Sequence, residues 1–320
     1  MPNLMLTNWC NYRCPYCFGM DMMAPKQKAQ SMSKETFLGI MDWLDRKPFD
    51  RVIHLMGGEP TLSPHFEWMV DWLLDKEYHI TVFSNLATQQ APAYAEKLAL
   101  LPVHWVVNVN NPVKWNAAQR ERITAALASL GTKANLTFNI IPDEPNELWA
   151  LELIEKYHLN PDIKVGFVLP TLTSSNMALK DSEYALVAER VCNLVKEGER
   201  LDVTIELECG VPTCAFTDEQ LGFLWRHRSQ VKSGCFSRLD ITPDGHVMYC
   251  LPLATAALKH YTEFESYPDC REWFEERLRP YRLLGNCLEC VDCPLNRPDK
   301  CHAACVAKNM INAKNVHLTL

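Results

Sequence analysis

The sequence predicts an α/β protein: a partial (β/α)6 barrel of the TIM type, followed by a small cysteine-rich C-terminal domain. In the first half of the 320 residues, short apolar runs alternate with amphipathic helical patterns. This alternation indicates right-handed βαβ units around a parallel sheet, with the helices outside. In the last third, regular apolar periodicity gives way to short segments and cysteine-rich loops. Because such sheets bind ligands at the C-terminal strand ends, we expect the functional residues there.

Six strands are expected in the barrel, each a short apolar run bounded by polar or turn residues. They cover residues 3–8, 51–56, 79–83, 104–109, 135–141 and 163–169. The first intervening helix has an N-cap at Ser33 and ends before Pro48. The second is expected to begin with a cap and first turn at Ser63 and Pro64. Further helices are expected near residues 93–101, 116–130 and 147–157.

Beyond Pro170 the pattern becomes less regular. An amphipathic helix with a stripe from Tyr184 to Val195 precedes a short strand at 203–207, a helix near 218–228 and a hairpin at 239–249. We therefore expect three parts. They are a barrel at 1–175, a helical and strand connection at 176–232, and a cysteine-rich domain at 233–320, which is too poor in apolar periodicity to be held by packing alone.

Composition and charge restrict the class of protein. The apolar fraction of 48% is ordinary for a globular protein, and no apolar run reaches the length of a transmembrane helix. Residues 1–9 lack the basic region of a signal peptide, so we expect a soluble, cytoplasmic protein with no membrane partner. The net charge of −7 disfavours a nucleic-acid partner. The 14 cysteines are too sparse for a disulfide scaffold, and in a reducing compartment they indicate metal binding.

Three cysteines, Cys10, Cys14 and Cys17, lie on the loop that follows the first expected strand. Thiolates at these spacings can hold three irons of a cubane cluster and leave the fourth iron open. A structural zinc site would want a fourth nearby ligand, and none lies close in the sequence. Zinc or an incidental group of loop cysteines is the alternative interpretation.

The next βα unit supplies the segment Gly57-Gly58-Glu59-Pro60 at the end of the second expected strand. Alone, such a tetrapeptide is a common turn whose glycines let the backbone approach a ligand closely. Together with the three cysteines and Tyr16 before the last of them, it resembles the radical SAM superfamily. The resemblance implies a [4Fe-4S] cluster whose open iron binds S-adenosylmethionine. Electron transfer into the sulfonium then yields methionine and a 5'-deoxyadenosyl radical, which abstracts a substrate hydrogen.

The resemblance also implies which residues contact S-adenosylmethionine. The glycine-containing segment matches the family segment that grips the methionine amino group, and Ser84-Asn85 matches a position that contacts the ribose or carboxylate. Alternation along the fourth strand puts Asn108 and Asn110 on its inward face, and we favour Asn108, because turn chemistry explains Asn110 equally well. The expected cofactor-binding residues are Tyr16, Gly57, Gly58, Glu59, Pro60, Ser84, Asn85 and Asn108.

The C-terminal cysteines begin with Cys235 and Cys250, which flank a hairpin turned at residues 243–245, so that their thiols come close. Cys209 and Cys214 lie upstream. Five more cysteines follow, with the close spacing of a ferredoxin. They are Cys287, Cys290, Cys293, Cys301 and Cys305.

This arrangement resembles the SPASM or twitch extension of radical SAM enzymes, which implies one or two auxiliary [4Fe-4S] clusters. It departs from a full SPASM module, because seven residues rather than five separate Cys293 from Cys301 and no cysteine follows Cys305. The preferred partition gives one cluster Cys214, Cys235, Cys250 and one distal thiolate. The second cluster takes most of the five C-terminal cysteines. One cluster and a zinc knuckle is the alternative.

These features predict a radical SAM enzyme that oxidatively modifies a ribosomally made peptide or a protein, with reduced flavodoxin or ferredoxin as electron donor. Only nine residues precede Cys10, so we expect no N-terminal leader-binding domain. The alternative substrate is a small molecule, which a sugar or polyol dehydrogenase or epimerase would use. A non-catalytic iron-sulfur redox or sensor protein is the alternative of another class. No residue is indicated as a catalytic acid or base.

Overall fold

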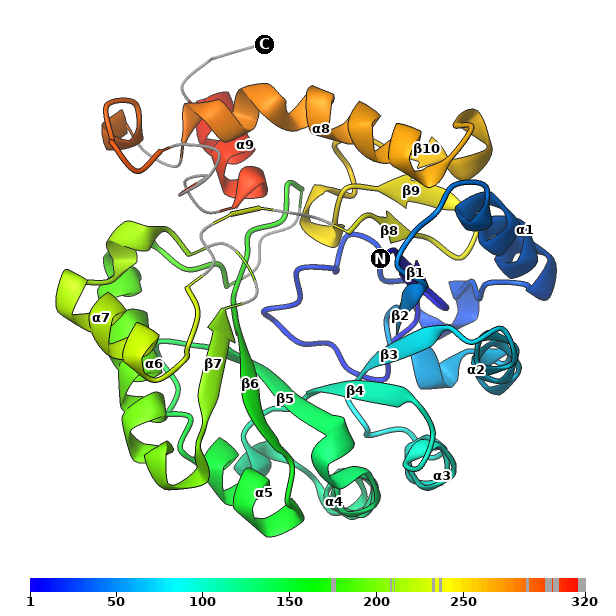
Figure 1. Ribbon diagram of the computed structural model, residues 1–320, viewed down its shortest axis with the longest axis horizontal. Coiled ribbons are helices and arrows are strands. Elements are labelled where there is room, and N and C mark those ends of the chain that lie inside the picture. The colour runs from blue at the N-terminus through cyan, green and yellow to red at the C-terminus, as the bar shows by residue number, and fades with distance from the viewer. Residues whose placement is uncertain are drawn as a thin grey trace.

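The computed structural model describes residues 1–173, 177–207, 209, 211–231, 234–235, 238–285, 288–296, 301 and 305–315. Its strands form one curved sheet in the order β10-β9-β8-β1-β2-β3-β4-β5-β6-β7. The sheet does not close on itself, and Figure 1 shows helices α1 to α6 along its outer side. The blue segment that follows β1 lies on the inner side of the curve. The prediction of an α/β partial barrel is confirmed.

Strands β1 to β7 are parallel, and each pairs with the next. They are β1 (Asn3–Met5), β2 (Val52–Met56), β3 (His79–Ser84), β4 (Val103–Asn108), β5 (Ala134–Ile140), β6 (Asn160–Phe167) and β7 (Thr204–Leu207). All seven overlap the segments expected from the sequence. The apolar alternate positions, such as Leu55, Val82 and Val107, face the outer helices and are fully buried in one core.

The helices are α1 (Lys34–Asp45), α2 (Phe66–Asp75), α3 (Ala91–Leu98), α4 (Ala117–Leu130), α5 (Trp149–Tyr157), α6 (Tyr184–Glu197), α7 (Asp218–Arg226), α8 (Tyr267–Leu284) and α9 (Val306–Asn315). Ser33 caps α1 as expected, by accepting a hydrogen bond from the Thr36 amide. At the start of α2, Ser63 is extended, as a cap residue is, and its hydroxyl accepts a hydrogen bond from the His65 amide at 3.4 Å. The helix itself begins later than expected, at Phe66.

The C-terminal hairpin continues the barrel sheet on the far side of β1. Strand β8 (Asp240–Ile241) pairs in parallel with β1, and β9 (His246–Met248) and β10 (Lys259–His260) follow in antiparallel pairs. Helix α8 was not expected from its charged sequence, yet its buried residues Tyr267, Cys270, Phe274 and Leu278 follow helical spacing. None of the helices that the structure describes is long and apolar enough to cross a membrane.

The inner face of the sheet carries buried polar side chains, among them His54 on β2. This residue is 4% exposed, its Nδ1 lies 2.9 Å from the Asn3 Oδ1 atom, and the Arg238 guanidinium is within 3.2 Å. Burial, together with the positive charge of Arg238, lowers the pKa of His54 to about 3. The folded protein therefore keeps this ring neutral across the physiological range.

We predict that His54 makes the protein acid-sensitive. An unfolded histidine takes up its proton near pH 6.5, whereas the folded ring does so near pH 3, so stability falls as the pH decreases below about 6.5. Between pH 7 and 5 this one group should remove about 2 kcal/mol from the free energy of unfolding. Urea unfolding of a His54→Gln variant should show correspondingly less pH dependence. His79→Gln, at an exposed position on β3, is the control and should keep the wild-type slope.

Candidate functional site

The loop of residues 9–18, here called the cysteine loop, carries Cys10, Cys14 and Cys17 directly beyond the end of β1. It is closed on itself by backbone contacts. The Cys17 amide donates to the Cys14 carbonyl oxygen at 3.1 Å. The Arg13 guanidinium donates to the carbonyl oxygens of Cys10 at 2.8 Å and Ala24 at 3.1 Å. These bonds hold the three thiols on a defined turn rather than on a free strand end.

The glycine turn at residues 57 and 58 lies directly against this loop. The Gly58 amide donates to the Thr7 carbonyl oxygen at 2.8 Å, and the Glu59 amide donates to the Trp9 carbonyl oxygen at 2.9 Å. A Cβ atom on Gly58 would lie 2.1 Å from the Trp9 oxygen, and one on Gly57 would lie 2.4 Å from the Thr7 oxygen. The two glycines are therefore required for close approach between two segments of the chain itself.

Glu59 joins the ends of β2 and β3. Its carboxylate, 1% exposed, accepts hydrogen bonds from the Thr61 hydroxyl at 2.7 Å, the Ser84 hydroxyl at 2.8 Å and the Asn85 amide at 2.8 Å. Burial raises the pKa of Glu59, while these hydrogen bonds lower it. The Ser84 hydroxyl also accepts from the Leu86 amide at 3.0 Å. Glu59 and Ser84 are therefore buried residues that support the site through hydrogen bonds within the protein. The adjacent Pro60 is also buried.

Asn85 connects β3 to the cysteine loop. Its side-chain amide donates to the Asn11 Oδ1 atom at 2.9 Å and lies 3.8 Å from the Cys10 sulfur. Its own oxygen accepts from the Ala87 amide at 2.9 Å, so the amide orientation is fixed. The structure therefore brings the expected residues Glu59, Ser84 and Asn85 together behind Cys10.

Tyr16 fixes the other side of the loop. Its ring packs with Ile141 and Val168, beyond the ends of β5 and β6, and its hydroxyl bonds to Asn110 and to the Cys14 thiol. Burial raises the pKa of Tyr16, so the phenol stays protonated. The amide that reaches the loop is thus Asn110, which the sequence ranked below Asn108. The Asn108 side chain is exposed, and its role remains a prediction.

The three thiols of the cysteine loop act on one another electrostatically. Burial above all, together with the charges of Glu59, Cys14 and Cys17, raises the pKa of Cys10 to about 12. Among the described residues, no group of three or more His, Cys, Asp or Glu side chains converges on a point where one metal ion would bind. A cubane distributes its thiolates over separate irons, whereas a structural zinc needs four converging ligands.

The C-terminal cysteines form two groups. The first, here called the proximal group, contains Cys235, Cys250 and Cys305, which pack against the main core, together with Cys209. Burial raises the pKa of Cys250 well above its usual value, and the charges of the other three thiolates raise it further. The second, here called the distal group, consists of Cys214, Cys290, Cys293 and Cys301. Burial raises the pKa of Cys214, and these three neighbours raise it further.

This grouping differs from the expected partition, which remains a prediction. Cys214 lies on an exposed 3-10 turn, Thr213–Ala215, between β7 and α7 and belongs with the distal group rather than with Cys235 and Cys250. Cys305 directly precedes α9. Because α9 packs on α8, Cys305 lies near Cys235 of the hairpin region. Cys209, five residues before Cys214, is a candidate ligand that the prediction left out. Cys287 lies outside the described residues.

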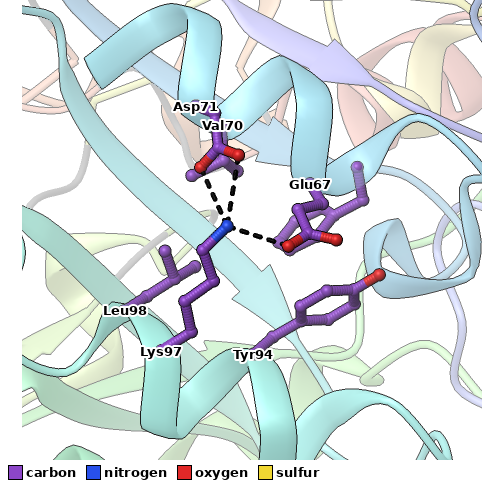
Figure 2. Close-up of a pocket in the computed structure, with 7 residues that line it drawn as sticks. Glu67, Val70, Asp71, Tyr94, Lys97 and Leu98 are labelled. Atoms are coloured by element: carbon purple, nitrogen blue, oxygen red, sulfur yellow. Dashed lines mark hydrogen bonds and ion pairs between the residues drawn. The ribbon is translucent and has the colours of Figure 1, made fainter. Parts of the chain in front are cut away.

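Two surface pockets lie outside these groups. One, between α2 and α3, contains the Lys97 ammonium, which lies 2.8 Å from a Glu67 oxygen and 3.1 Å from Asp71 (Figure 2). All three side chains are more than 40% exposed, so this is a solvated ion-pair network on the outside of the barrel. The second lies at the C-terminal ends of β4 and β5, and its lining includes Asn110 and Asn139. It is therefore next to the Tyr16 side of the cysteine loop.

A buried ion pair supports that second pocket, and sequence patterns gave no indication of it. The Glu147 carboxylate lines the pocket and pairs with Arg190 of α6, both nearly buried. Arg190 also donates to the carbonyl oxygens of Ile141 at 2.9 Å and Pro145 at 2.8 Å. The loop after β5 is thereby attached to α6.

Residues 4–112 match the family model of the radical SAM superfamily. No curated protein sequence matches the chain. The fold is similar to SuiB of Streptococcus suis bound to its precursor peptide SuiA, with a TM-score of 0.70 and 12% identity over 97% of this chain and 72% of that one. It is also similar to anSMEcpe with bound AdoMet, with a TM-score of 0.64 and 15% identity over 95% of this chain and 89% of that one. For anSMEcpe with AdoMet and the Kp18Cys peptide, the TM-score is 0.63, the identity 15% and the coverage 95% and 89%.

We predict that Gly58→Ala displaces the cysteine loop. The added methyl group would overlap the Trp9 carbonyl oxygen, which belongs to the backbone and cannot rotate away. The free energy of unfolding should fall by roughly 1–3 kcal/mol, and iron retained after anaerobic reconstitution should fall with it. Gly222→Ala is the control, because its Cβ atom would meet only the end of the Arg226 side chain at 3.4 Å. That variant should be unchanged or more stable by about 0.5 kcal/mol. Equal behaviour of the two variants would contradict the prediction.

Proposed function

We propose that this chain is a radical SAM oxidoreductase that modifies a peptide or protein substrate, on the premise that its residues 4–112 match the family model of that superfamily. The observation that carries the proposal is the constrained cysteine loop. Its three thiols are held between the glycine turn after β2, Asn85 after β3 and Asn110 after β4. This is the C-terminal edge of the parallel strands, where barrels of this type bind their ligands.

Each expected residue has a role under this proposal. Cys10, Cys14 and Cys17 would ligate a [4Fe-4S] cluster. The backbone of residues 57–60 would bind the methionine part of S-adenosylmethionine, with Asn85 and Asn108 beside it. When bound, these cofactors supply an electron and a 5'-deoxyadenosyl radical that abstracts a substrate hydrogen. The chain itself orients the loop through Tyr16 and Glu59, and it partly shields the thiol side of the site from water, because Cys10 is half-buried.

The two C-terminal thiol groups would bind auxiliary clusters. We assign one cluster to the proximal group and the other to the distal group, with Cys287 as a further possible ligand of the second. Such centres would accept the second electron of the oxidation, and reduced flavodoxin or ferredoxin would supply the first. The division into a barrel at 1–175, a connection at 176–232 and a cluster domain at 233–320 belongs to the same proposal.

A peptide is favoured as substrate for two reasons. SuiB and anSMEcpe, which share this fold over at least 95% of the chain, were each solved with a peptide bound. The pocket beside the cysteine loop is lined by amides and carboxylates, including Asn139 and Glu144, which can pair with main-chain groups of a peptide. A sugar or polyol is the alternative, because the same groups bind hydroxyls.

Co-expression tests the substrate class directly. The chain should be produced under anaerobic conditions together with each short peptide encoded beside its gene, and the peptides analysed by mass spectrometry. Loss of two hydrogen atoms from one peptide, absent when Cys14→Ala replaces the wild type, is the expected result. Unmodified peptides, combined with oxidation of a sugar or polyol by the same preparation, would transfer the assignment to the alternative.

We predict that Cys14→Ala abolishes cleavage of S-adenosylmethionine. A cubane that loses one of three protein thiolates cannot keep its open iron in place, so formation of 5'-deoxyadenosine should fall below detection. Chromatography of reduced, reconstituted protein measures this product. Cys192→Ala, a change on helix α6, is the control and should retain wild-type cleavage. A wild-type protein that binds iron but never forms 5'-deoxyadenosine would instead indicate a redox or sensor protein.

We predict that Cys250→Ala separates the two kinds of site. Only the proximal group loses a thiolate, so cleavage of S-adenosylmethionine without substrate should continue, while iron should fall from about twelve to about eight atoms per chain. Iron analysis and 5'-deoxyadenosine formation are measured on the same samples. Unchanged iron content would show that Cys250 is not required to hold a cluster, since three thiols remain in the proximal group, as many as the cysteine loop offers.

A further inference from the structure

We propose that Arg282 is a positioning residue of the proximal group: it fixes Tyr249 against Cys235 and places a positive charge that raises the reduction potential of a cluster bound there. The inference rests on the proposed function, because it requires an auxiliary cluster at Cys235, Cys250 and Cys305. The two residues to which it assigns a role, Arg282 of α8 and Tyr249 of the hairpin, do not belong to the expected ligand set.

Arg282 and Tyr249 form one clamp. Arg282 lies on the last turns of α8, and its side chain is 16% exposed. Its guanidinium lies over the Tyr249 ring at 5.3 Å and donates to the Tyr249 hydroxyl. That hydroxyl donates in turn to the Cys235 carbonyl oxygen at 3.1 Å. Because Tyr249 directly precedes Cys250, the clamp fixes both chain segments that carry these two thiols.

The start of α9 adds partial positive charge to the same place. The Val306 amide lowers the pKa of the Cys235 thiol, and the Lys308 and Ala307 amides lower that of the Cys305 thiol, in each case against the larger effect of burial. The Asn309 side chain donates to the Tyr281 carbonyl oxygen at 3.1 Å, which joins α9 to α8 immediately before Arg282. Hydrogen bonds to thiolate sulfurs and a helix N-terminus both favour added negative charge.

One atom of the clamp is unsatisfied. The Arg282 Nε atom is buried and has no hydrogen-bond partner among the described residues. A buried cationic N–H without an acceptor is costly, and cluster sulfide or thiolate would be an acceptor of the right charge. The unsatisfied donor beside the proximal group is therefore consistent with a negatively charged cluster bound there.

The neighbouring acid does not cancel the arginine. Glu275 pairs with Arg282 at 2.5 Å, but its carboxylate is the more exposed partner, at 27%. The less exposed Arg282 guanidinium is also bonded to Tyr249, whose hydroxyl donates to the Cys235 carbonyl oxygen. A positive charge held there favours the negative charge that a cluster gains when it is reduced.

The test is an anaerobic redox titration, followed by electron paramagnetic resonance, of holoenzyme carrying Cys14→Ala to remove the N-terminal cluster. In this background Arg282→Gln should lower the reduction equilibrium constant of one auxiliary centre by about tenfold, equivalent to about 59 mV for one electron. Arg282→Lys keeps the positive charge but loses the planar guanidinium group, and its reduction potential should lie close to that of the protein with Arg282. Arg279→Gln, exposed on the same helix, is the matched control and should leave the potential unchanged.

The remaining outcomes are decisive. An Arg282→Gln potential equal to that of Arg279→Gln would overturn the proposal. If Arg282→Gln loses iron and Arg282→Lys retains it at the wild-type potential, the positioning role is supported. If both lose iron while circular dichroism stays native, the residue acts by shape alone, and the charge proposal is wrong. A parent protein with no auxiliary iron at all would refute the cluster assignment in the proposed function, a failure distinct from an unchanged potential.

Discussion

The carbonyl oxygens of Thr7 and Trp9 lie so close to Gly57 and Gly58 that no side chain fits between these two segments. This contact fixes the cysteine loop to the end of β2. The buried carboxylate of Glu59 then fixes the same turn to β3, through Ser84 and the Asn85 amide. Because each donor and acceptor in this network is enclosed, losing one would leave its partner unsatisfied in a place that water does not reach. The loops that follow three successive strands therefore behave as one rigid support for the thiols.

The same support extends to the proximal group through the sheet. Strand β8 pairs in parallel with β1, and at the first pair the Asn3 amide donates to the Asp240 carboxylate at 2.7 Å. The other oxygen of Asp240 accepts from the Leu251 amide at 2.9 Å, directly after Cys250. Burial raises the pKa of Asp240 to about 6, so the carboxylate is ionised and accepts both bonds at neutral pH. Strand β1 thus connects the cysteine loop at its end with the Cys250 turn at its side.

The sequence predicts what local patterns determine and misses what packing determines. Barrel strands are buried by helices on one face, and their apolar runs identify them. Helix α8 was not recognised because charged residues dominate its sequence, although its buried positions follow helical spacing. Asn110 was ranked below Asn108 because turn chemistry explained it equally well, yet it lies beyond the end of β4 and its side chain bonds to Tyr16 of the cysteine loop. The cysteine partition cannot be obtained from spacing, since Cys305 reaches the hairpin only because α9 packs on α8.

Both thiol sites are surrounded by charges of either sign. At the cysteine loop, burial and Glu59 raise the pKa of the Cys10 thiol, while Lys114 and Arg13 lower the pKa values of Cys14 and Cys17 against the effect of burial. At the proximal group, burial and Asp240 raise the pKa of Cys250, while Arg282 lowers that of Cys235 against the effect of burial. The sites differ instead in what holds them: turns after β2 and β3 support the cysteine loop, whereas α8 and α9 support the proximal thiols through Arg282 and Asn309. Under the proposed function, a change on α8 should therefore affect a cluster at the proximal group more directly than one at the cysteine loop.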